Sequence, residues 1–191
     1  MKKALYGYGG HAREVAFLMQ EDVTFFVSDE FANDLARPIS SIEKDEYEIM
    51  IAIADPVIRK SICEKINGIK YFTFIHPTAI IGNDVKIGEG SYVGPHCIIT
   101  TNVKIGKHSI ISRFNSIGHD VVCKDFLSMM PGSVISGNNS IGESVYIGTN
   151  SSFKEKIQVC DNLIIGLNSG VVTNIKESGT YVGTPSVKMK W

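Results

Sequence analysis

The chain has 191 residues, 43% of them hydrophobic, which is enough for one or two globular domains. Its formal net charge of −1 at pH 7 gives no support for binding to nucleic acid or to an anionic membrane surface. The longest apolar stretches are strand-sized, so we expect no signal peptide and no membrane-spanning segment. Because the four cysteines show no C-x-x-C spacing, we expect a reduced, cytoplasmic protein.

Residues 1–72 have the pattern of a small α/β domain. Short apolar runs alternate with helical spacing and predict the order strand, helix, strand, strand, helix, strand. The strands are expected at Lys3–Tyr6, Val23–Val27, Glu48–Ala54 and Tyr71–Phe74, with one helix after the turn at Gly10 and another over Pro56–Ile66, capped by Asp55. This order favours a mainly parallel, Rossmann-like sheet.

A glycine-rich turn, GYGGHA, follows the first expected strand and fits the dinucleotide fingerprint G-x-G-x-x-A. Glycines there let backbone amides approach a phosphate at a helix N-terminus. The candidate nucleotide-binding residues are Gly7, Gly9, Gly10, His11 and, at the end of the second strand, Asp29. About seventy residues make a truncated dinucleotide fold, so a mononucleotide fits better. A tight turn that binds nothing is the alternative.

Seventeen uninterrupted hexapeptides run from Ile75 to Lys176, within a second expected domain at residues 73–178 that is followed by a tail at 179–191. The first residue of every hexapeptide is apolar, which chance would produce roughly once in a million at 43% hydrophobic residues. A strict period of six is typical of a parallel β-helix. Because a strand has a period of two, each hexapeptide needs a corner, and glycine at the second position is expected to permit it.

The pattern resembles that of known hexapeptide-repeat proteins, and this resemblance implies that three hexapeptides close a triangular coil of 18 residues. A β-sandwich with accidental periodicity is the alternative. The small fifth residue of each hexapeptide is expected to face the narrow core, and Cys97 and Cys123 both fall at inward positions of the repeat. Asn115 and Asn139 also take the fifth position, where a buried amide must be hydrogen-bonded. Either these amides bond to Ser133 or to backbone carbonyls, or the wall bulges at these positions.

His119 and Asp120 are the candidate catalytic pair, because they lie at a corner in Ile117-Gly-His-Asp-Val-Val. A carboxylate beside an imidazole fixes its tautomer and stabilises the imidazolium, which suits a general base. The amide of Gly137, one coil above, is placed to receive a developing oxyanion. A surface His–Asp pair without catalytic function is the alternative.

The other histidines give weaker signals. His76, at the start of the repeats, is interpreted as structural, whereas His96 and His108 take outward positions and are expected to be solvated. Zinc-dependent hexapeptide enzymes need three converging imidazoles, and His96, His108 and His119 do not form such a trio. We therefore expect no metal site.

Four segments together resemble the sialic acid O-acetyltransferase and nucleotide-amino-sugar N-acetyltransferase family of hexapeptide-repeat acyltransferases. They are YGYGGHAREV, FIHPTAIIG, SIGHDVV and TYVGTPSVKMK. The resemblance covers essentially the whole chain and is strongest to bacterial enzymes that act on UDP- or dTDP-linked 4-amino-4,6-dideoxy sugars in surface-glycan biosynthesis. It implies a left-handed β-helix and a homotrimer with each active site between two subunits.

The resemblance also implies roles for single residues. His119 matches the catalytic base and Asp120 the acid that follows it, while the glycine-rich turn matches the nucleotide-sugar site. The implied oxyanion and acetyl-CoA contacts are Gly137, Thr149, Gly166, Leu167 and Lys188. Many relatives carry a further histidine nine residues after the base, where this chain has Ser128.

The predicted function is transfer of acetyl from acetyl-CoA to the amine of a nucleotide-linked amino sugar. No hexapeptide carries an inserted loop to cover a substrate, which independently favours a site shared with a neighbouring subunit. One alternative is O-acetylation of sialic acid or another sugar hydroxyl. The other is a nucleotide-binding scaffold without catalytic activity.

Overall fold

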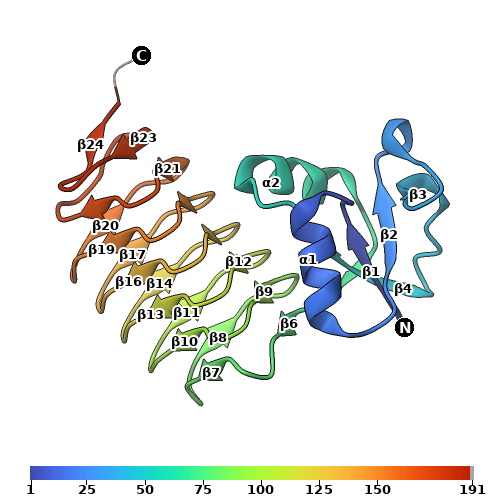
Figure 1. The fold of residues 1–191 in the computed structure, drawn as a ribbon, viewed down its shortest axis with the longest axis horizontal. Coiled ribbons are helices and arrows are strands. Elements are labelled where there is room, and N and C mark those ends of the chain that lie inside the picture. The colour runs from blue at the N-terminus through green and yellow to red at the C-terminus, as the bar shows by residue number, and fades with distance from the viewer. Residues whose placement is uncertain (190–191) are drawn as a thin grey trace.

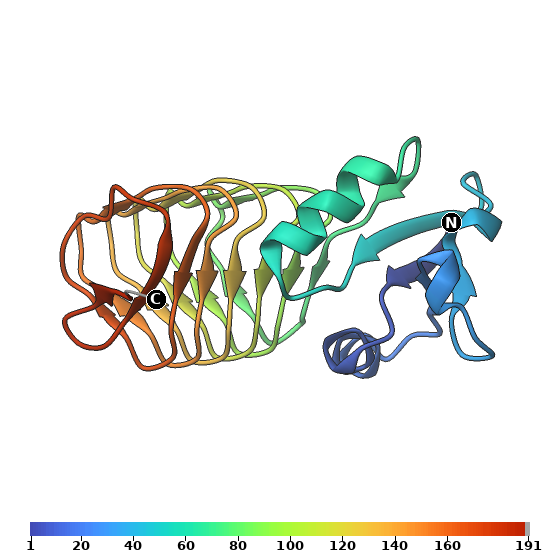
Figure 2. The same ribbon diagram turned by 90° about the horizontal axis from the view of Figure 1, so that it is seen from above.

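The computed structural model describes residues 1–189, which form an α/β domain beside a three-walled prism (Figures 1 and 2). The chain enters the prism at its lower end in Figure 1 and winds upward, one coil after another, towards the C-terminus. Within residues 1–189, neither helix combines the length and the apolar content that crossing a bilayer requires.

The α/β domain contains one parallel sheet of five strands in the order β3-β2-β1-β4-β5. Its elements are β1 (Lys2–Tyr6), α1 (Gly10–Met19), β2 (Thr24–Val27), η1 (Asp29–Phe31), β3 (Arg37–Pro38), η2 (Ile39–Ser41), β4 (Tyr47–Ile51), α2 (Pro56–Lys65) and β5 (Lys70–Tyr71). The first three expected strands and both helices are present close to their predicted bounds, and β3 is an additional edge strand. The strand expected at Tyr71–Phe74 is divided, because β5 ends at Tyr71 and Phe74 begins a strand of the prism. The Asp55 carboxylate caps α2 by accepting hydrogen bonds from the amides of Val57 and Ile58, both at 2.9 Å.

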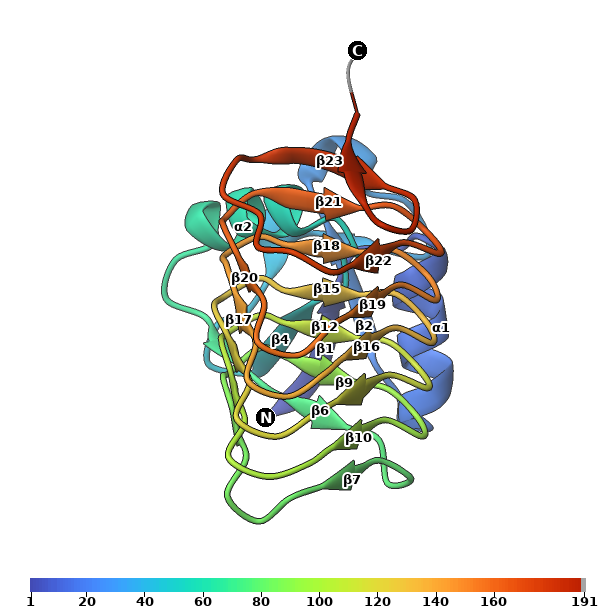
Figure 3. The same ribbon diagram turned by 90° about the vertical axis from the view of Figure 1, so that its left-hand side faces the viewer.

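From β6 onward the chain winds in coils of 18 residues, and each coil adds one short strand to each of three sheets (Figure 3). The three walls are named here by what lies on their outer sides. The wall on which the α/β domain packs, called the covered wall, consists of β6 (Phe74–Ile75), β9 (Tyr92–Val93), β12 (Ile110–Ile111), β15 (Ser128–Met129), β18 (Tyr146–Ile147), β21 (Leu163–Ile165), β23 (Gly179–Val182) and β24 (Val187–Lys188). The apolar wall consists of β7 (Ile80–Ile81), β10 (Ile98–Ile99), β13 (Ser116–Ile117), β16 (Val134–Ile135), β19 (Ser152–Phe153) and β22 (Gly170–Val171). The polar wall consists of β8 (Lys86–Ile87), β11 (Lys104–Ile105), β14 (Val122–Cys123), β17 (Ser140–Ile141) and β20 (Gln158–Val159). The predicted coil length is therefore confirmed.

The prism core is built from the first and fifth residues of the hexapeptides, as the pattern predicts. Cys97 and Cys123 are buried in it. Asn115 is also buried, and its Nδ2 donates to the carbonyl oxygens of Ser112 at 2.8 Å and Met129 at 3.1 Å. Asn139, one coil and one wall further along the chain, makes equivalent bonds: its Nδ2 donates to the carbonyl oxygens of Ser136 and Lys154, and its Oδ1 accepts the Ile157 backbone amide. These amides therefore link successive coils without leaving a buried polar group unpaired.

The corners differ from the prediction in one respect. The left-handed backbone conformation falls on the fourth residue of the hexapeptides, for example Asn102 (φ 53°) and Asp120 (φ 58°), and not on the glycine at the second position. The glycines are needed for a different reason, namely the close approach of the next coil. A Cβ on Gly82 would lie 2.0 Å from the carbonyl oxygen of Thr100.

The α/β domain packs on the covered wall. Tyr92 and Ile110, which point outward from that wall, lie in one hydrophobic cluster with Leu5, Ala12 and Met50. The ion pairs Glu14–Arg113 and Lys60–Glu143 flank the contact. The outward residues of this wall are therefore part of a domain interface.

Arg59 of α2 fastens the two parts together. Its fully buried guanidinium donates to the carbonyl oxygens of His108 (2.8 Å), Phe126 and Leu127 (both 3.1 Å) and to Ser128 Oγ (2.8 Å). Burial lowers the pKa of Arg59 to about 9, so the side chain remains a cation at neutral pH. Ser128 thus lies beneath α2 and serves this contact.

The expectation that His108 is solvated is wrong. The α/β domain covers it, and its Nε2 lies 3.3 Å from Cys63 Sγ while its ring stacks on Phe126. Burial, followed by the charge of Arg59, lowers the pKa of His108 to about 4. His96 is exposed, as predicted, and stacks on Phe114.

Candidate active site

His119 and Asp120 lie at the corner between β13 of the apolar wall and β14 of the polar wall. The left-handed conformation of Asp120 turns its carboxylate back towards the preceding side chain, and Asp120 Oδ2 lies 2.7 Å from His119 Nδ1. The side chains remain 57% and 45% exposed, so a substrate can reach them. The sequence left open whether these neighbouring side chains meet, and the structure brings them together, which leaves Nε2 of the imidazole free to exchange a proton.

Asp120 is held ionised by hydrogen bonds. Asn102 Nδ2 donates to Asp120 Oδ1 at 2.6 Å, and this bond, followed by the one with His119, lowers the pKa of the Asp120 carboxyl below its usual value. A carboxylate beside Nδ1 favours the tautomer with the proton on that nitrogen.

Gly137 lies one coil above His119, on the same corner. A Cβ on Gly137 would lie 2.7 Å from both Cε1 and Nε2 of the imidazole, so the ring occupies the space that a side chain would take. Within residues 1–189, the N–H of Gly137 donates no hydrogen bond. A free amide beside the imidazole fits the expected oxyanion donor.

The other residues expected to contact acetyl-CoA lie elsewhere on the prism. Thr149, Gly166 and Leu167 are on the corner between the covered and apolar walls, and Thr149 and Leu167 are exposed. Lys188 lies on β24, where its Nζ pairs with Glu177 Oε2 at 3.2 Å. The apolar wall separates this corner from His119, so a single chain does not bring the two groups together.

Two adjoining cavities of about 600 and 590 Å³ open in the α/β domain and share Tyr6, Ser28, Ile62 and Lys65 as lining residues. Both lie where β1 and β2 end, the edge at which parallel sheets bind ligands. Gly7 and Gly9 line the second cavity and Asp29 lines the first.

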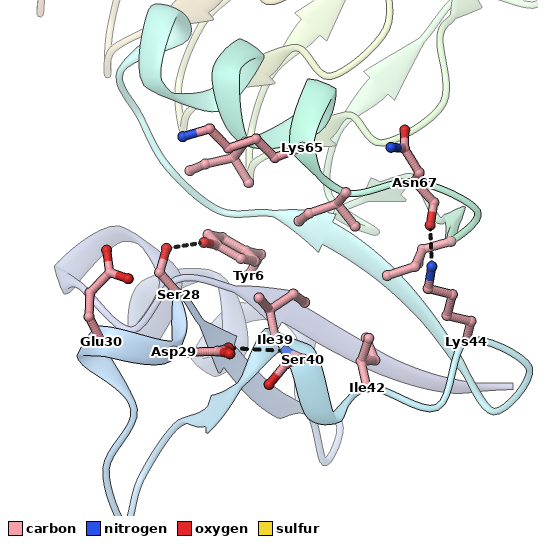
Figure 4. Close-up of a pocket in the computed structure, with 13 residues that line it drawn as sticks. Tyr6, Ser28, Asp29, Glu30, Ile39, Ser40, Ile42, Lys44, Lys65 and Asn67 are labelled. Carbon is pink, nitrogen blue, oxygen red and sulfur yellow. Dashed lines mark hydrogen bonds between the residues drawn. The ribbon is translucent and has the colours of Figure 1, made fainter.

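The first cavity has an ordered polar rim (Figure 4). Asp29 Oδ1 accepts the Ser40 amide at 3.1 Å, and bonds with Ser40 lower the pKa of the Asp29 carboxyl. Tyr6 and Ser28 share a hydrogen bond of 2.7 Å between their hydroxyls. Lys44 and Lys65 add two cations to the lining. The lining also contains the carboxylate of Glu30, so the rim offers hydrogen-bond partners and charges of both signs to a ligand.

Gly10 and His11 are not among the lining residues of these cavities. Gly10 begins α1, and a side chain there would meet open space. The His11 ring packs edge-on against Tyr92 of the prism at 5.8 Å, and burial lowers its pKa. His11 thus lies at the domain interface, and its Nε2 has no hydrogen-bond partner within residues 1–189.

Sequence reasoning missed the two lysines of the cavity and the bond from Asn102. Lys44 and Lys65 carry no motif, because their positions depend on how η2 and α2 fold over the sheet. The 18-residue spacing did place Asn102 beside Asp120, but the direction of its amide needs coordinates. Among residues 1–189, no three His, Cys, Asp or Glu side chains gather closely enough to hold a metal ion.

Comparison with known proteins points to one family. The family model described as "Bacterial transferase hexapeptide (six repeats)" matches residues 72–101. The GDP-perosamine N-acetyltransferase of Escherichia coli O157:H7 is 27% identical over 109 residues, which cover 56% of this chain and 49% of that protein. An acyl-[acyl-carrier-protein]--UDP-N-acetylglucosamine O-acyltransferase of Rickettsia bellii is 34% identical over 56% of this chain and 40% of its own length. The chain thus spans half or less of the length of these relatives.

Solved structures match over nearly the whole chain. The acetyltransferase domain of PglB from Neisseria gonorrhoeae, in complex with acetyl coenzyme A, has a TM-score of 0.89 and 26% identity and covers 98% of both chains. WeeI from Acinetobacter baumannii has a TM-score of 0.87 and 26% identity, covering 98% of this chain and 99% of its own. A perosamine N-acetyltransferase mutant from Caulobacter crescentus, with CoA and GDP-perosamine, shares the fold at 23% identity with a TM-score of 0.88, covering 98% of this chain and 96% of its own.

Hexapeptide coils stacked in this way are the repeat that the matching bacterial transferase model describes over residues 72–101. The chain is similar to bacterial hexapeptide-repeat transferases, and its relatives include a nucleotide-amino-sugar N-acetyltransferase, which confirms the predicted resemblance.

Proposed function

We propose that the protein transfers acetyl from acetyl-CoA to the amine of a nucleotide-linked amino sugar, with His119 as the general base. The observation that carries the proposal is the contact of 2.7 Å between His119 Nδ1 and Asp120 Oδ2 beside the free amide of Gly137. The relatives named above include N-acetyltransferases and a structure in complex with acetyl coenzyme A, which supports both the reaction and the acetyl donor.

His119 Nε2 accepts the proton that the sugar amine loses as its nitrogen attacks the thioester carbonyl carbon. The new C–N bond replaces the C–S bond, and His119 returns the proton to the departing thiolate of CoA. Asp120 stabilises the imidazolium that exists between these two steps. The Gly137 N–H donates to the carbonyl oxygen as negative charge develops on it.

Acetyl-CoA is assigned to a groove between two subunits of a homotrimer. The outward residues of the apolar wall carry no charge, and Ile80, Ile98 and Val134 are exposed there at 66%, 43% and 39%. Packing this wall around a threefold axis brings the His119 corner of one subunit next to the Thr149 and Leu167 corner of another. The two groups of expected contact residues then meet in one site.

The nucleotide-sugar is assigned to the two cavities of the α/β domain. Gly7 and Gly9 leave room for close approach of a phosphate, and Lys44 and Lys65 supply cations. Asp29 faces the first cavity, where its free oxygen suits a ribose hydroxyl or a base edge. UDP, dTDP and GDP are all candidates for the nucleotide that carries the sugar. GDP is included because a relative is named for GDP-perosamine.

We also propose that the chain comprises a Rossmann-like domain over 1–72, a left-handed β-helix over 73–178 and a tail at 179–191, and that the enzyme works in the cytoplasm. The parallel pairing of β23 with β21 carries the tail along the covered wall.

The proposal is tested by release of free thiol from acetyl-CoA in the presence of a panel of acceptors. We expect turnover with one of the UDP-, dTDP- or GDP-linked 4-amino-4,6-dideoxy sugars. Turnover with CMP-sialic acid alone would move the assignment to O-acetylation. Nucleotide binding without thiol release from any acceptor would identify a scaffold.

A further inference from the structure

The His119 corner contains a column of three polar side chains that the proposed reaction does not use directly. Asp84, Asn102 and Asp120 occupy the same corner in successive coils, 18 residues apart. Each contacts the next, so the column leads from the lower end of the prism to the imidazole.

The lower link of the column is a carboxylate that fixes a turn. Asp84 Oδ2 accepts hydrogen bonds from the backbone N–H of Asn102 at 2.9 Å and from the Thr101 hydroxyl at 2.8 Å. These two bonds hold the backbone of Asn102 from below, where its φ is 53°. Asparagine is one of the few residues that adopt this left-handed conformation readily.

The upper link is directed by the side-chain amide. Asn102 Nδ2 donates to Asp120 Oδ1 at 2.6 Å, whereas the other oxygen, Oδ2, meets His119 Nδ1 at 2.7 Å. The carboxylate is therefore held at both oxygens. The bond from Asn102 is also the leading cause of the lowered pKa of Asp120.

We infer that Asn102 is a positioning residue of the catalytic pair, which sets the orientation of the Asp120 carboxylate and through it the tautomer of His119. This inference rests on the proposed function of His119. An Asp120 carboxylate that is free to rotate would leave Nδ1 unpaired for part of the time. The fraction of His119 with its proton on Nδ1 and a free Nε2 would then fall.

Two variants separate this role from a structural one. Asn102→Gly removes the amide without opposing the left-handed backbone, since glycine adopts it freely. Asn162→Gly is the matched control, because Asn162 has the same backbone conformation (φ 57°) at the corner between the polar and covered walls, away from His119. Should Asn102→Gly fail to fold, Asn102→Asp keeps a residue that tolerates this conformation and replaces the donor by an acceptor.

The readouts are the ¹⁵N chemical shifts of the His119 ring, measured without substrate, and steady-state kinetics. For Asn102→Gly we expect the shifts to move from the Nδ1-protonated form towards a mixture of tautomers. We also expect kcat to fall about tenfold with both KM values within about twofold, because binding does not use this amide. Asn162→Gly is expected to match the wild type in both measurements.

The inference is overturned if the Asn102 variants leave the ring shifts and kcat unchanged while His119→Ala is inactive, and the proposed function then stands. If His119→Ala is fully active, the proposed function fails instead. The ring shifts then still decide whether Asn102 sets the tautomer.

Discussion

The imidazole of His119 lies in the space that a side chain on Gly137 would fill, with an ideal Cβ only 2.7 Å from Cε1 and Nε2. Gly137 does not adopt a positive φ, so its backbone does not require glycine. At Gly137 all three nearest atoms belong to this ring, whereas at Gly82, Gly88 and Gly142 the nearest atom is backbone of the next coil. The missing side chain at 137 therefore serves the position of the histidine.

Gly137→Ala is expected to displace the ring while preserving the fold, because the half-exposed imidazole can move outward. We expect kcat to fall about 10- to 100-fold, the cost of misplacing a catalytic group by about an ångström. Steady-state kinetics and a thermal melt check this, with Ser136→Ala as a control on the neighbouring residue. Unchanged turnover in Gly137→Ala would mean that the observed ring position is not the working one.

Arg59→Leu is expected to lower the free energy of unfolding by about 3 to 5 kcal/mol, because several buried carbonyl groups and the Ser128 hydroxyl lose their donor. Lys60→Ala is the control, since it breaks an ion pair that is partly exposed and costs about 1 kcal/mol or less. Denaturant titration at a fixed protein concentration measures both. Equal losses for the two variants would refute the role of Arg59 in fastening the α/β domain to the prism.

Stability is expected to fall on mild acidification because of His108. Its folded pKa of about 4 lies below the usual value of 6.5, so between these values the unfolded chain binds a proton that the folded protein does not. Stability conferred by the neutral imidazole is complete above pH 6.5 and is lost as the pH falls towards 4. The expected loss from this residue between pH 7 and pH 5 is about 2 kcal/mol.

Denaturant titrations at several pH values test this contribution. His108→Phe keeps a flat ring against Phe126 and removes the titrating group, so its stability should change less over the same interval. An identical pH dependence in wild type and variant would show that other groups cause the loss.

The proposed trimer is tested on the apolar wall. Ile98→Glu places a charge on the outward side of β10, where we expect it to prevent association, because an unpaired charge in an interface is costly. Lys104→Glu changes the charge at the equivalent outward position of the polar wall and should leave the trimer intact. Sedimentation velocity distinguishes the species, and a wild-type monomer would contradict the shared active site.

The period of six predicted which residues of each hexapeptide face the core of the prism. The register is well determined, because a shift by one position would turn apolar residues such as Ile117 and Cys123 outward. The inward position of Asn115 and Asn139 followed from the same register. The contact between His119 and Asp120 did not, because a repeat pattern does not say whether adjacent side chains at a corner turn towards each other. His108 was mispredicted because a repeat pattern shows which way a side chain points but not what covers it. Tyr92 and Ile110 at outward positions were the available signal that one wall is covered.

Arg59 and the cavity lysines could not be found in this way. A charged residue in the first turns of a helix is normally solvated, and the burial of Arg59 depends on how α2 meets β15. The roles of the site residues depend, in addition, on substrates and on neighbouring subunits, neither of which a local pattern records.

The most direct measurement is the rate of thiol release from acetyl-CoA by His119→Ala with the acceptor that the wild type uses. We expect turnover to fall at least about a hundredfold, with little change in the melting temperature, because the exposed imidazole supports proton transfer and contributes little to the fold. Near-normal turnover in this variant would contradict the assignment of His119 as the base.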